Sequence, residues 1–297
     1  MQEPDRLKSF HTAAQLLPER LWRAAYSLNE EQRAQCEEIR VRLDRPLAAT
    51  VEGKTVLLSE GIRPQRGELD EVLARATEAS VHTYLEQLRR GFLTTKHGHR
   101  LGICSHAPDG ASRVLRGLSS VNIRVARQIG GLGSELILCG PEGFRNTLIL
   151  GEPGAGKTTL LRELCRRLSA DMRVAVADER YEIAACADGA PRFHVGNCDV
   201  LSGGRKAETI PMLLRSMSPQ VLATDEITDE EDCRALLACA GCGCGLLAAA
   251  HGSGLGDLRR RPAYRQILES GVFRQAVIVI QEKGVRSYRL TALSAGA

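Results

Sequence analysis

Short apolar runs alternate with helical repeats through the second half of the chain. Five runs have the length and composition of buried strands, at residues 148–150, 174–177, 221–224, 246–250 and 276–280. After the first run, apolar residues recur at helical spacing at Leu160, Leu161, Leu164, Cys165 and Leu168. Strands that alternate with helices in this way predict βαβ units and a mainly parallel sheet.

The first half of the chain has a different pattern. Three helices are expected: one with Leu17, Leu21, Trp22, Ala25 and Leu28, one with Cys36, Ile39 and Leu43, and one over residues 69–88 that stops at Gly91. Residues 47–51 with 55–58 and residues 92–95 with 100–104 predict two hairpins, residues 121–125 predict a strand, and Pro108-Asp109-Gly110 predicts a turn. We therefore predict an α+β domain over residues 1–130, ending at Gly130, Gly131 and Gly133, and a second domain over residues 131–297.

The first strand of the second domain leads into a glycine-rich loop. Its residues are Gly151, Glu152, Pro153, Gly154, Ala155, Gly156, Lys157, Thr158 and Thr159, which match the pattern G-x-x-x-x-G-K-[ST] (Walker A). Glycines let the backbone turn tightly and present N–H groups to phosphate, and the following helix adds its positive end. Lys157 is expected to reach the β- and γ-phosphates, and the Thr158 hydroxyl to hold Mg²⁺. The loop predicts nucleotide binding.

The first four strands of the second domain end at Gly151 of the loop and at the polar residues Asp178, Asp225 and His251. In open α/β sheets ligands bind beyond the carboxyl ends of the strands, so these residues are expected around one crevice. Asp225 and Glu226 follow an apolar strand, as in a Walker B motif. Asp225 would hold Mg²⁺ directly or through water, and Glu226 would orient or deprotonate the attacking water. A solvated acidic turn is the alternative.

Several further side chains are candidates for the same site. Glu179 would help position water and Arg180 would meet phosphate or a neighbouring subunit, although an ordinary ion-pairing loop fits them equally. His251 would sense the γ-phosphate, against the alternative of a structural histidine. Arg124, Arg127 and Arg215 are each interpreted as a finger or clamp on the nucleotide, or as a surface charge.

Composition narrows the function classes. Forty Lys and Arg against 36 Asp and Glu give a net charge of +4, and aromatic residues make up 4%, so there is no strong nucleic-acid signal. No apolar leader occupies the first twenty residues and no apolar run is long enough for a bilayer, which predicts a soluble cytosolic protein. The cluster Cys239, Cys242 and Cys244 is interpreted as packing rather than metal binding, and His97 and His99 as hairpin-loop residues.

Longer stretches around these motifs resemble known families. Residues 215–221, 225–229 and the segment at His251 resemble the secretion and pilus motor ATPases. Residues 119–127, VADERYEIAAC and HGSGLGDLRRRP more closely resemble the stage III sporulation protein AA family, and the resemblance runs from about Leu17 to Leu293. By motif, the nucleotide loop of the family corresponds to residues 151–159, its acidic box to Asp178 and Glu179, Walker B to Asp225 and Glu226, and the histidine box to His251.

The resemblance implies a RecA-like P-loop ATPase domain behind a smaller N-terminal domain, with ATP and Mg²⁺ as cofactors. It also implies a hexameric ring in the mother-cell cytoplasm, at the inner face of a membrane, working with the membrane proteins of a forespore channel. One position departs from the secretion motors, which carry arginine where this chain has Thr228. An arginine contact made there is lost, or is supplied by Arg215 or Arg180.

The leading hypothesis is ATP hydrolysis, with Lys157, Glu226, Glu179 and His251 as catalytic residues. The alternatives are a nucleotide-gated scaffold that hydrolyses little, and a RecA-like ATPase that acts on nucleic acid.

Overall fold

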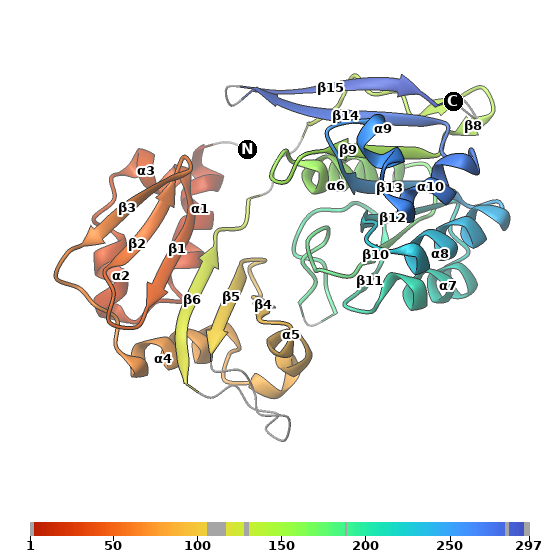
Figure 1. Ribbon diagram of the computed structural model, residues 1–297. Helices are drawn as coiled ribbons and strands as arrows, with labels where there is room; N and C mark the ends of the chain where they lie inside the picture. The colour runs from red at the N-terminus through yellow and green to blue at the C-terminus, as the bar shows by residue number, and fades with distance from the viewer. Residues whose placement is uncertain (1–2, 106–116, 128–130, 188, 283–284, 294–297) are drawn as a thin grey trace. The chain divides into compact units, whose positions relative to one another are not determined.

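The computed structural model describes residues 3–105, 117–127, 131–187, 189–282 and 285–293 (Figure 1). The chain divides into two compact units. One consists of Met1–Gln128 with Ala185–Arg192, and the other of Ile129–Ala184 with Phe193–Ala297. The turn expected at Pro108-Asp109-Gly110 lies outside the described residues, as does Gly130 of the expected boundary.

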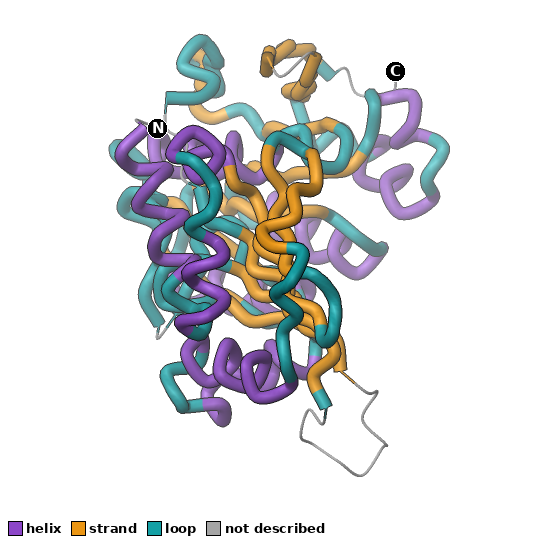
Figure 2. Tube along the Cα trace, turned by 90° about the vertical axis from the view of Figure 1, so that its left-hand side faces the viewer, coloured by secondary structure: helices purple, strands orange, loops and turns teal. Residues whose placement is uncertain are grey.

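The first unit is built on a six-stranded antiparallel sheet in the order β3-β2-β1-β6-β5-β4. Its strands are β1 (Cys36–Arg42), β2 (Leu47–Val51), β3 (Lys54–Ser59), β4 (Phe92–Thr94), β5 (Arg100–Ser105) and β6 (Leu118–Arg124). Its helices are α1 (Glu3–Ala14), α2 (Glu19–Ala25), α3 (Glu30–Gln35), α4 (Arg66–Ala76), the 3₁₀ helix η1 (Val81–Tyr84) and α5 (Leu85–Arg89). Figure 2, with helices in purple and strands in orange, shows the helices near the N-terminus beside strands.

One face of this sheet packs against α1, α2 and α4. The apolar cluster includes Ile39, Val41, Leu101 and Ile123 from the strands, Phe10, Leu21, Leu69 and Val72 from the helices, and Leu17 from the turn between α1 and α2. Both predicted hairpins are confirmed, as β2–β3 and β4–β5. The predicted strand at residues 121–125 is confirmed as part of β6.

The helix expected around Cys36, Ile39 and Leu43 is wrong. The helix α3 ends at Gln35, and Cys36 begins β1, which pairs with both β2 and β6. In this strand Ile39 and Val41 are buried while the polar residues between them are more exposed. The alternation with a period of two is present in the sequence and outweighs the three apolar positions that fit a helix.

The single helix expected over residues 69–88 is also wrong, because the chain breaks after α4. Glu78 and Ala79 have φ of 49° and 61°, in the left-handed region, and η1 and α5 follow separately. Thr77 caps the end of α4 through its hydroxyl, which donates to the carbonyl of Leu73. The helix expected near the N-terminus is shorter than residues 17–28: α2 covers Glu19–Ala25, and α1 precedes it.

The second unit has a seven-stranded sheet in the order β11-β10-β12-β13-β9-β14-β15. Its strands are β9 (Thr147–Gly151), β10 (Val174–Asp178), β11 (Asp199–Ser202), β12 (Val221–Glu226), β13 (Gly245–His251), β14 (Gln275–Glu282) and β15 (Val285–Ala292), beside a small ribbon of β7 (Cys139–Gly140) and β8 (Gly143–Phe144). Its helices are α6 (Lys157–Leu168), α7 (Lys206–Met217), α8 (Glu230–Gly241), α9 (Leu255–Arg259) and α10 (Pro262–Glu269). All strand pairs in the sheet are parallel except β14–β15.

The five predicted strands and the mainly parallel sheet are therefore confirmed. Strand residues such as Leu148, Leu222 and Leu246 pack in one cluster with α7, α8 and α10. The helix α6 contacts β9, β12 and β13 and buries Leu160, Leu161, Leu164 and Cys165, as its periodicity predicted. The sequence reading missed β11 and β15. Both are edge strands in which polar residues interrupt the apolar ones, so neither has the continuous apolar run of a buried strand.

The cysteine cluster lies at the end of α8. Cys239 and Cys244 are buried and their thiols are hydrogen-bonded to each other, whereas Cys242 is exposed. Within the described residues, no group of three or more His, Cys, Asp or Glu side chains is placed to hold a metal ion. None of the described helices combines the length and apolar character needed to cross a bilayer.

The two histidines of the β4–β5 hairpin have different surroundings. His97 is exposed in the turn, whereas His99 is 1% exposed. The backbone N–H of Ala126 donates to His99 Nδ1 at 3.0 Å, so the ring proton is on Nε2 and faces the Thr12 hydroxyl at 2.9 Å. His99 therefore lies in the hairpin, as expected, but its side chain is buried in the core.

Candidate functional site

The phosphate-binding loop (residues 151–159) joins β9 to α6. Gly154 and Gly156 have φ of 77° and 99°, a left-handed conformation that glycine adopts readily, and Gly156 immediately precedes α6. A Cβ on Gly151 would lie 3.1 Å from the Val279 carbonyl oxygen. The loop therefore needs these glycines for its backbone conformation and for close packing. Thr158 and Thr159 are half-buried in the first turn of α6.

Lys157 is the buried cation of the loop. Its Nζ is 2.9 Å from each of three acceptors: the carbonyl oxygens of Gly151 and Glu152, and His251 Nδ1. An ammonium group has three N–H donors, so all of them are used. Burial lowers the pKa of Lys157, and the nearby charge of Glu226 opposes that shift.

His251 connects the lysine to the Walker B strand. Because its Nδ1 accepts from Lys157, the ring proton is on Nε2, which lies 3.0 Å from Glu226 Oε2. The same carboxylate oxygen accepts from Arg180 at 3.0 Å. A continuous path of hydrogen bonds thus runs from Lys157 through His251 and Glu226 to Arg180. It joins three strand ends, those of β9, β13 and β12, to the loop after β10.

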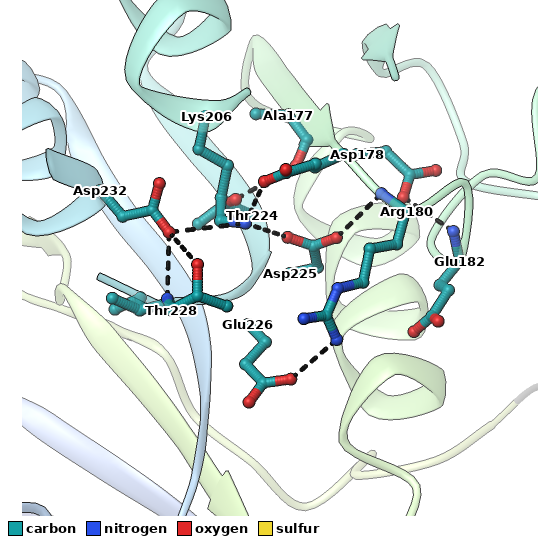
Figure 3. Close-up of polar contacts among 12 residues, drawn as sticks. Ala177, Asp178, Arg180, Glu182, Lys206, Thr224, Asp225, Glu226, Thr228 and Asp232 are labelled. Atoms are coloured by element: carbon teal, nitrogen blue, oxygen red, sulfur yellow. Dashed lines mark hydrogen bonds and ion pairs between the residues drawn. The ribbon is translucent and has the colours of Figure 1, made fainter. Parts of the chain in front are cut away.

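Asp225 lies in a second polar cluster, shown in Figure 3. Its Oδ1 is 3.2 Å from Lys206 Nζ, and its Oδ2 accepts from the backbone N–H of Arg180 at 3.3 Å. Lys206 is fully buried and also pairs with Glu179 at 2.6 Å and Asp232 at 3.6 Å. Burial raises the pKa of Asp225 to about 7, although Lys206 works in the opposite direction. Burial alone would lower the pKa of Lys206, but its three carboxylates raise it.

Asp178 shapes the loop that carries Glu179 and Arg180. Its carboxylate accepts three backbone N–H bonds, from Glu182, Ile183 and Ala184, at 2.8 to 3.1 Å. Figure 3 draws the bond from Glu182. Burial raises the pKa of Asp178, and the three N–H bonds partly offset that effect. Arg162 of α6 holds the same loop by donating to the carbonyls of Glu182 and Ile183 at 2.7 and 2.6 Å. Asp178 therefore has a structural role, distinct from the chemistry expected at this strand end.

A cavity of about 330 Å³ opens beside the phosphate-binding loop. Its walls are Gly151, Glu152, Pro153 and Ala155 of the loop, Gly252 and Ser253 after β13, Ile278 to Gln281 of β14, and Arg289 of β15. The site thus has open space next to the loop, bounded on one side by the C-terminal hairpin.

The structure brings together Lys157, Glu179, Arg180, Asp225, Glu226 and His251, as the strand ends led us to expect. The other candidate arginines are not among the partners of these residues. Arg124 pairs with Glu38 at 3.2 Å, and Arg127 donates to the carbonyl of Cys36 at 2.7 Å, both within the first unit. Arg215 is exposed in the last turn of α7, which leads into the N-terminal end of β12. Arg215 thus lies at the N-terminal ends of the parallel strands, whereas the phosphate-binding loop lies at their C-terminal ends. It therefore does not reach the nucleotide site of its own chain.

The sequence reading missed Lys206, although the sequence contains a signal for it. The buried face of α7 consists of Lys206, Thr209, Ile210 and Leu213, at the spacing of one helix face. A lysine at the start of an apolar stripe, shortly before an acidic strand end, indicates a buried cation. From the sequence, Thr228 is notable only because secretion motors carry arginine at that position. Its backbone N–H and hydroxyl donate to Asp232 Oδ2, the oxygen that also faces Lys206.

Comparison with known sequences assigns the chain to a family. The family described as "Sporulation stage III, protein AA" matches residues 11–289. The "Stage III sporulation protein AA" of Bacillus subtilis (strain 168) is 36% identical over 281 residues, which are 91% of each chain. The chain belongs to the stage III sporulation protein AA family. This confirms the resemblance drawn from the motifs.

Solved structures establish the fold of this family member. The pilus retraction motor PilT with bound ADP matches with a TM-score of 0.61 at 14% identity, over 88% of this chain and 80% of that one. The Legionella pneumophila ATPase DotB matches with a TM-score of 0.58 at 16% identity, over 90% of this chain and 80% of that one. The chain therefore has the RecA-like α/β fold of secretion and pilus ATPases, as predicted.

Proposed function

We propose that the chain binds and hydrolyses ATP as a secretion-type motor ATPase of sporulation. The observation that carries the proposal is the path of hydrogen bonds from Lys157 through His251 to Glu226. It links the lysine of a phosphate-binding loop to the carboxylate best suited to act on water. The fold shared with DotB, an ATPase, and with PilT, a motor with bound ADP, supports the same function.

Each residue of the site has a role in this proposal. Lys157 binds the β- and γ-phosphates with the N–H groups of the loop. A phosphate oxygen at Lys157 competes with His251 Nδ1 for the same ammonium group. Binding of phosphate therefore changes the hydrogen bonding of His251, and through it that of Glu226. Glu226 then orients or deprotonates the attacking water, while Arg180 and Glu179 supply the nearby charges.

The site has oxygen ligands suited to Mg²⁺, which would neutralise charge on the β- and γ-phosphates. Thr158 is half-buried at the start of α6 and supplies its hydroxyl. The two carboxylate oxygens of Asp225 already face Lys206 and the N–H of Arg180. Asp225 is therefore expected to hold the ion through water rather than directly.

Assembly and location follow from the family resemblance. We propose a homo-oligomeric ring, hexameric in the complete form, at the cytoplasmic face of a membrane, with the membrane proteins of a forespore channel as partners. Arg215 faces away from the nucleotide site of its own chain, and an exposed arginine of this kind would act on a neighbouring subunit. Arg124 and Arg127 are proposed nucleotide contacts that the ring would bring into reach.

The affinity for a fluorescent ATP analogue in Mg²⁺ tests nucleotide binding. Lys157→Ala removes the only ammonium group of the loop and is expected to weaken binding by about a hundredfold, since bonds to charged groups contribute about 1.5–3 kcal/mol each. Lys54→Ala removes the same charge from an exposed position on β3 and should bind as the wild type does. Equal affinity of wild type and Lys157→Ala would contradict the proposal.

One observation favours a second candidate, a nucleotide-gated scaffold. Glu226 is already held by both Arg180 and His251, which restrains it from acting on water. The scaffold would assemble on ATP and hydrolyse little. Light scattering with and without a non-hydrolysable ATP analogue, combined with sporulation of cells carrying Glu226→Gln, separates the two. Full assembly and normal sporulation of that variant would select the scaffold.

A further inference from the structure

The C-terminal hairpin extends the sheet past the end of the phosphate-binding strand. The strand β14 runs parallel to β9 as far as the pair Leu150 and Ile278, and beyond that pair its partner is β15. The strand β15 returns beside it and sets Arg286 opposite Gln281. Because Gln281 is three residues past Ile278, Arg286 lies about 10 Å beyond the last paired residue of β9, at the level of the phosphate-binding loop.

Arg286 contacts that loop at its last glycine. A Cβ built on Gly156 would lie 3.0 Å from both Cζ and Nε of Arg286, and 3.4 Å from its Nη1. The guanidinium group therefore covers Gly156, the residue that precedes Lys157 and the start of α6. This contact joins residues that are far apart in the sequence, and none of the sequence motifs predicts it.

The charges around Arg286 favour an anion as its partner. The side chain is partly buried, and the ion pairs among the side chains that the structure describes do not include Arg286. It instead lies beside the positive N-terminal end of α6, next to the residue before Lys157. Like charges held together without a counter-ion destabilise the fold, whereas an anion bound between them reverses the sign of the interaction.

We propose that Arg286 is a phosphate-binding residue of the nucleotide site in its own chain. Its planar guanidinium donates two parallel N–H bonds, a geometry that matches two oxygens of a phosphate group. The hairpin β14–β15 thereby forms one wall of the nucleotide site. The inference rests on the proposed function, because the phosphate in question belongs to the nucleotide.

Binding of ATP, ADP and adenosine to Arg286→Met, Arg286→Lys and the wild type tests the inference. Arg286→Met should weaken ATP binding by about tenfold or more, as expected for loss of a charge-assisted pair of bonds. Its affinity for adenosine, which has no phosphate, should not change. Arg286→Lys keeps the positive charge but loses the two parallel N–H donors of the guanidinium. Its affinity for ATP should lie between those of Arg286→Met and the wild type. Arg265→Met removes the same charge from an exposed position on α10 and should match the wild type.

Thermal unfolding without nucleotide separates binding from a structural role. Removing a cation from the positive end of α6 should leave the melting temperature of Arg286→Met at or above the wild-type value, with a smaller increase on adding ATP. A lower melting temperature of Arg286→Met with unchanged ATP affinity would overturn the inference. If Arg286→Met does not fold, the same two measurements are made on Arg286→Lys. If Lys157→Ala abolishes ATP binding but Arg286→Met does not weaken it, the role of Arg286 is wrong and the proposed function stands. If the wild type binds no ATP, both fail.

Discussion

Lys206 illustrates how one buried side chain organises the acidic half of the site. It is fully buried, and its Nζ lies within 3.6 Å of carboxylate oxygens of Glu179, Asp225 and Asp232. An ammonium group and three carboxylates are stable in such a place only if they compensate one another. Lys206 therefore holds the Walker B carboxylate, the loop after β10 and the first turn of α8 together.

Lys206→Met should destabilise the second unit strongly. The change leaves Asp225 and Asp232 buried without their cation, and breaking a buried pair in this way costs about 3–5 kcal/mol. Urea unfolding followed by circular dichroism measures the loss. The neighbouring Arg205→Met provides a matched control, since Arg205 pairs with Glu231 at the surface and should leave the midpoint nearly unchanged. Equal midpoints for the two variants would refute the compensating role of Lys206.

His99 makes the stability of the first unit depend on pH. Burial lowers the pKa of His99 from 6.5 to about 3, so the folded chain keeps the ring neutral. Below pH 6.5 the unfolded chain takes up a proton that the folded chain does not, and stability falls as pH falls from about 6.5 towards 3. The slope is about 1.4 kcal/mol per pH unit, or roughly 2 kcal/mol between pH 6.5 and 5.

Fluorescence of Trp22, the single tryptophan, reports unfolding of the first unit directly, because it packs against that core. Urea midpoints at pH 7, 6 and 5 should decrease in the wild type and in His82→Asn, whose histidine is exposed. They should decrease less in His99→Asn, which keeps an acceptor for the Ala126 N–H and cannot be protonated. An identical slope in all three proteins would show that another group is responsible.

At the level of elements, the backbone of the loop after β10 is held in place by hydrogen bonds from two neighbouring elements. Asp178 accepts three of its N–H groups, and Arg162 of α6 binds two of its carbonyls. The loop presents Glu179 to Lys206 and Arg180 to Glu226. A helix and a strand end thus position two charged side chains that are adjacent in sequence but belong to different clusters.

Asp178→Asn should loosen this loop. An amide has one oxygen, so its NH₂ group would face the N–H of Ala184, and a buried donor left unpaired costs about 1–3 kcal/mol. Hydrogen exchange at Ala184 should become faster, and ATP turnover should decrease as Arg180 moves. Asp171→Asn, at an exposed turn after α6, should change neither. Unchanged exchange at Ala184 in Asp178→Asn would contradict the role given to Asp178.

The sequence alone predicts some of these elements but not the contacts between them. The parallel strands and their four polar ends were predicted because a buried strand and its terminal residue are local in sequence. The contacts of Lys206 and Arg286 depend on which strands are neighbours and in what register, so a local pattern does not contain them. The strand β1 was misread because three apolar positions fit a helix, whereas the sheet partners β2 and β6 favour the alternating pattern.

On the scale of the whole molecule, a unit with the fold of secretion and pilus ATPases follows an antiparallel sheet unit. The hydrogen-bond path of the proposed nucleotide site lies within the second unit, at the carboxyl ends of β9, β13 and β12 and the loop after β10. Every charged residue of the path from Lys157 to Arg180 belongs to that unit. ATP binding should therefore persist in dilute solution, whereas the proposed mechanical work requires the ring.

Phosphate release under steady-state conditions, with Mg²⁺ and at concentrations that allow assembly, tests the central claim most directly. The wild type should turn over ATP. Glu226→Gln should bind ATP with wild-type affinity but hydrolyse it at least about a hundredfold more slowly, because general-base assistance contributes about 10²–10⁴ in rate. Lys157→Ala should do neither. Wild-type phosphate release no faster than that of Glu226→Gln would contradict hydrolysis at this site.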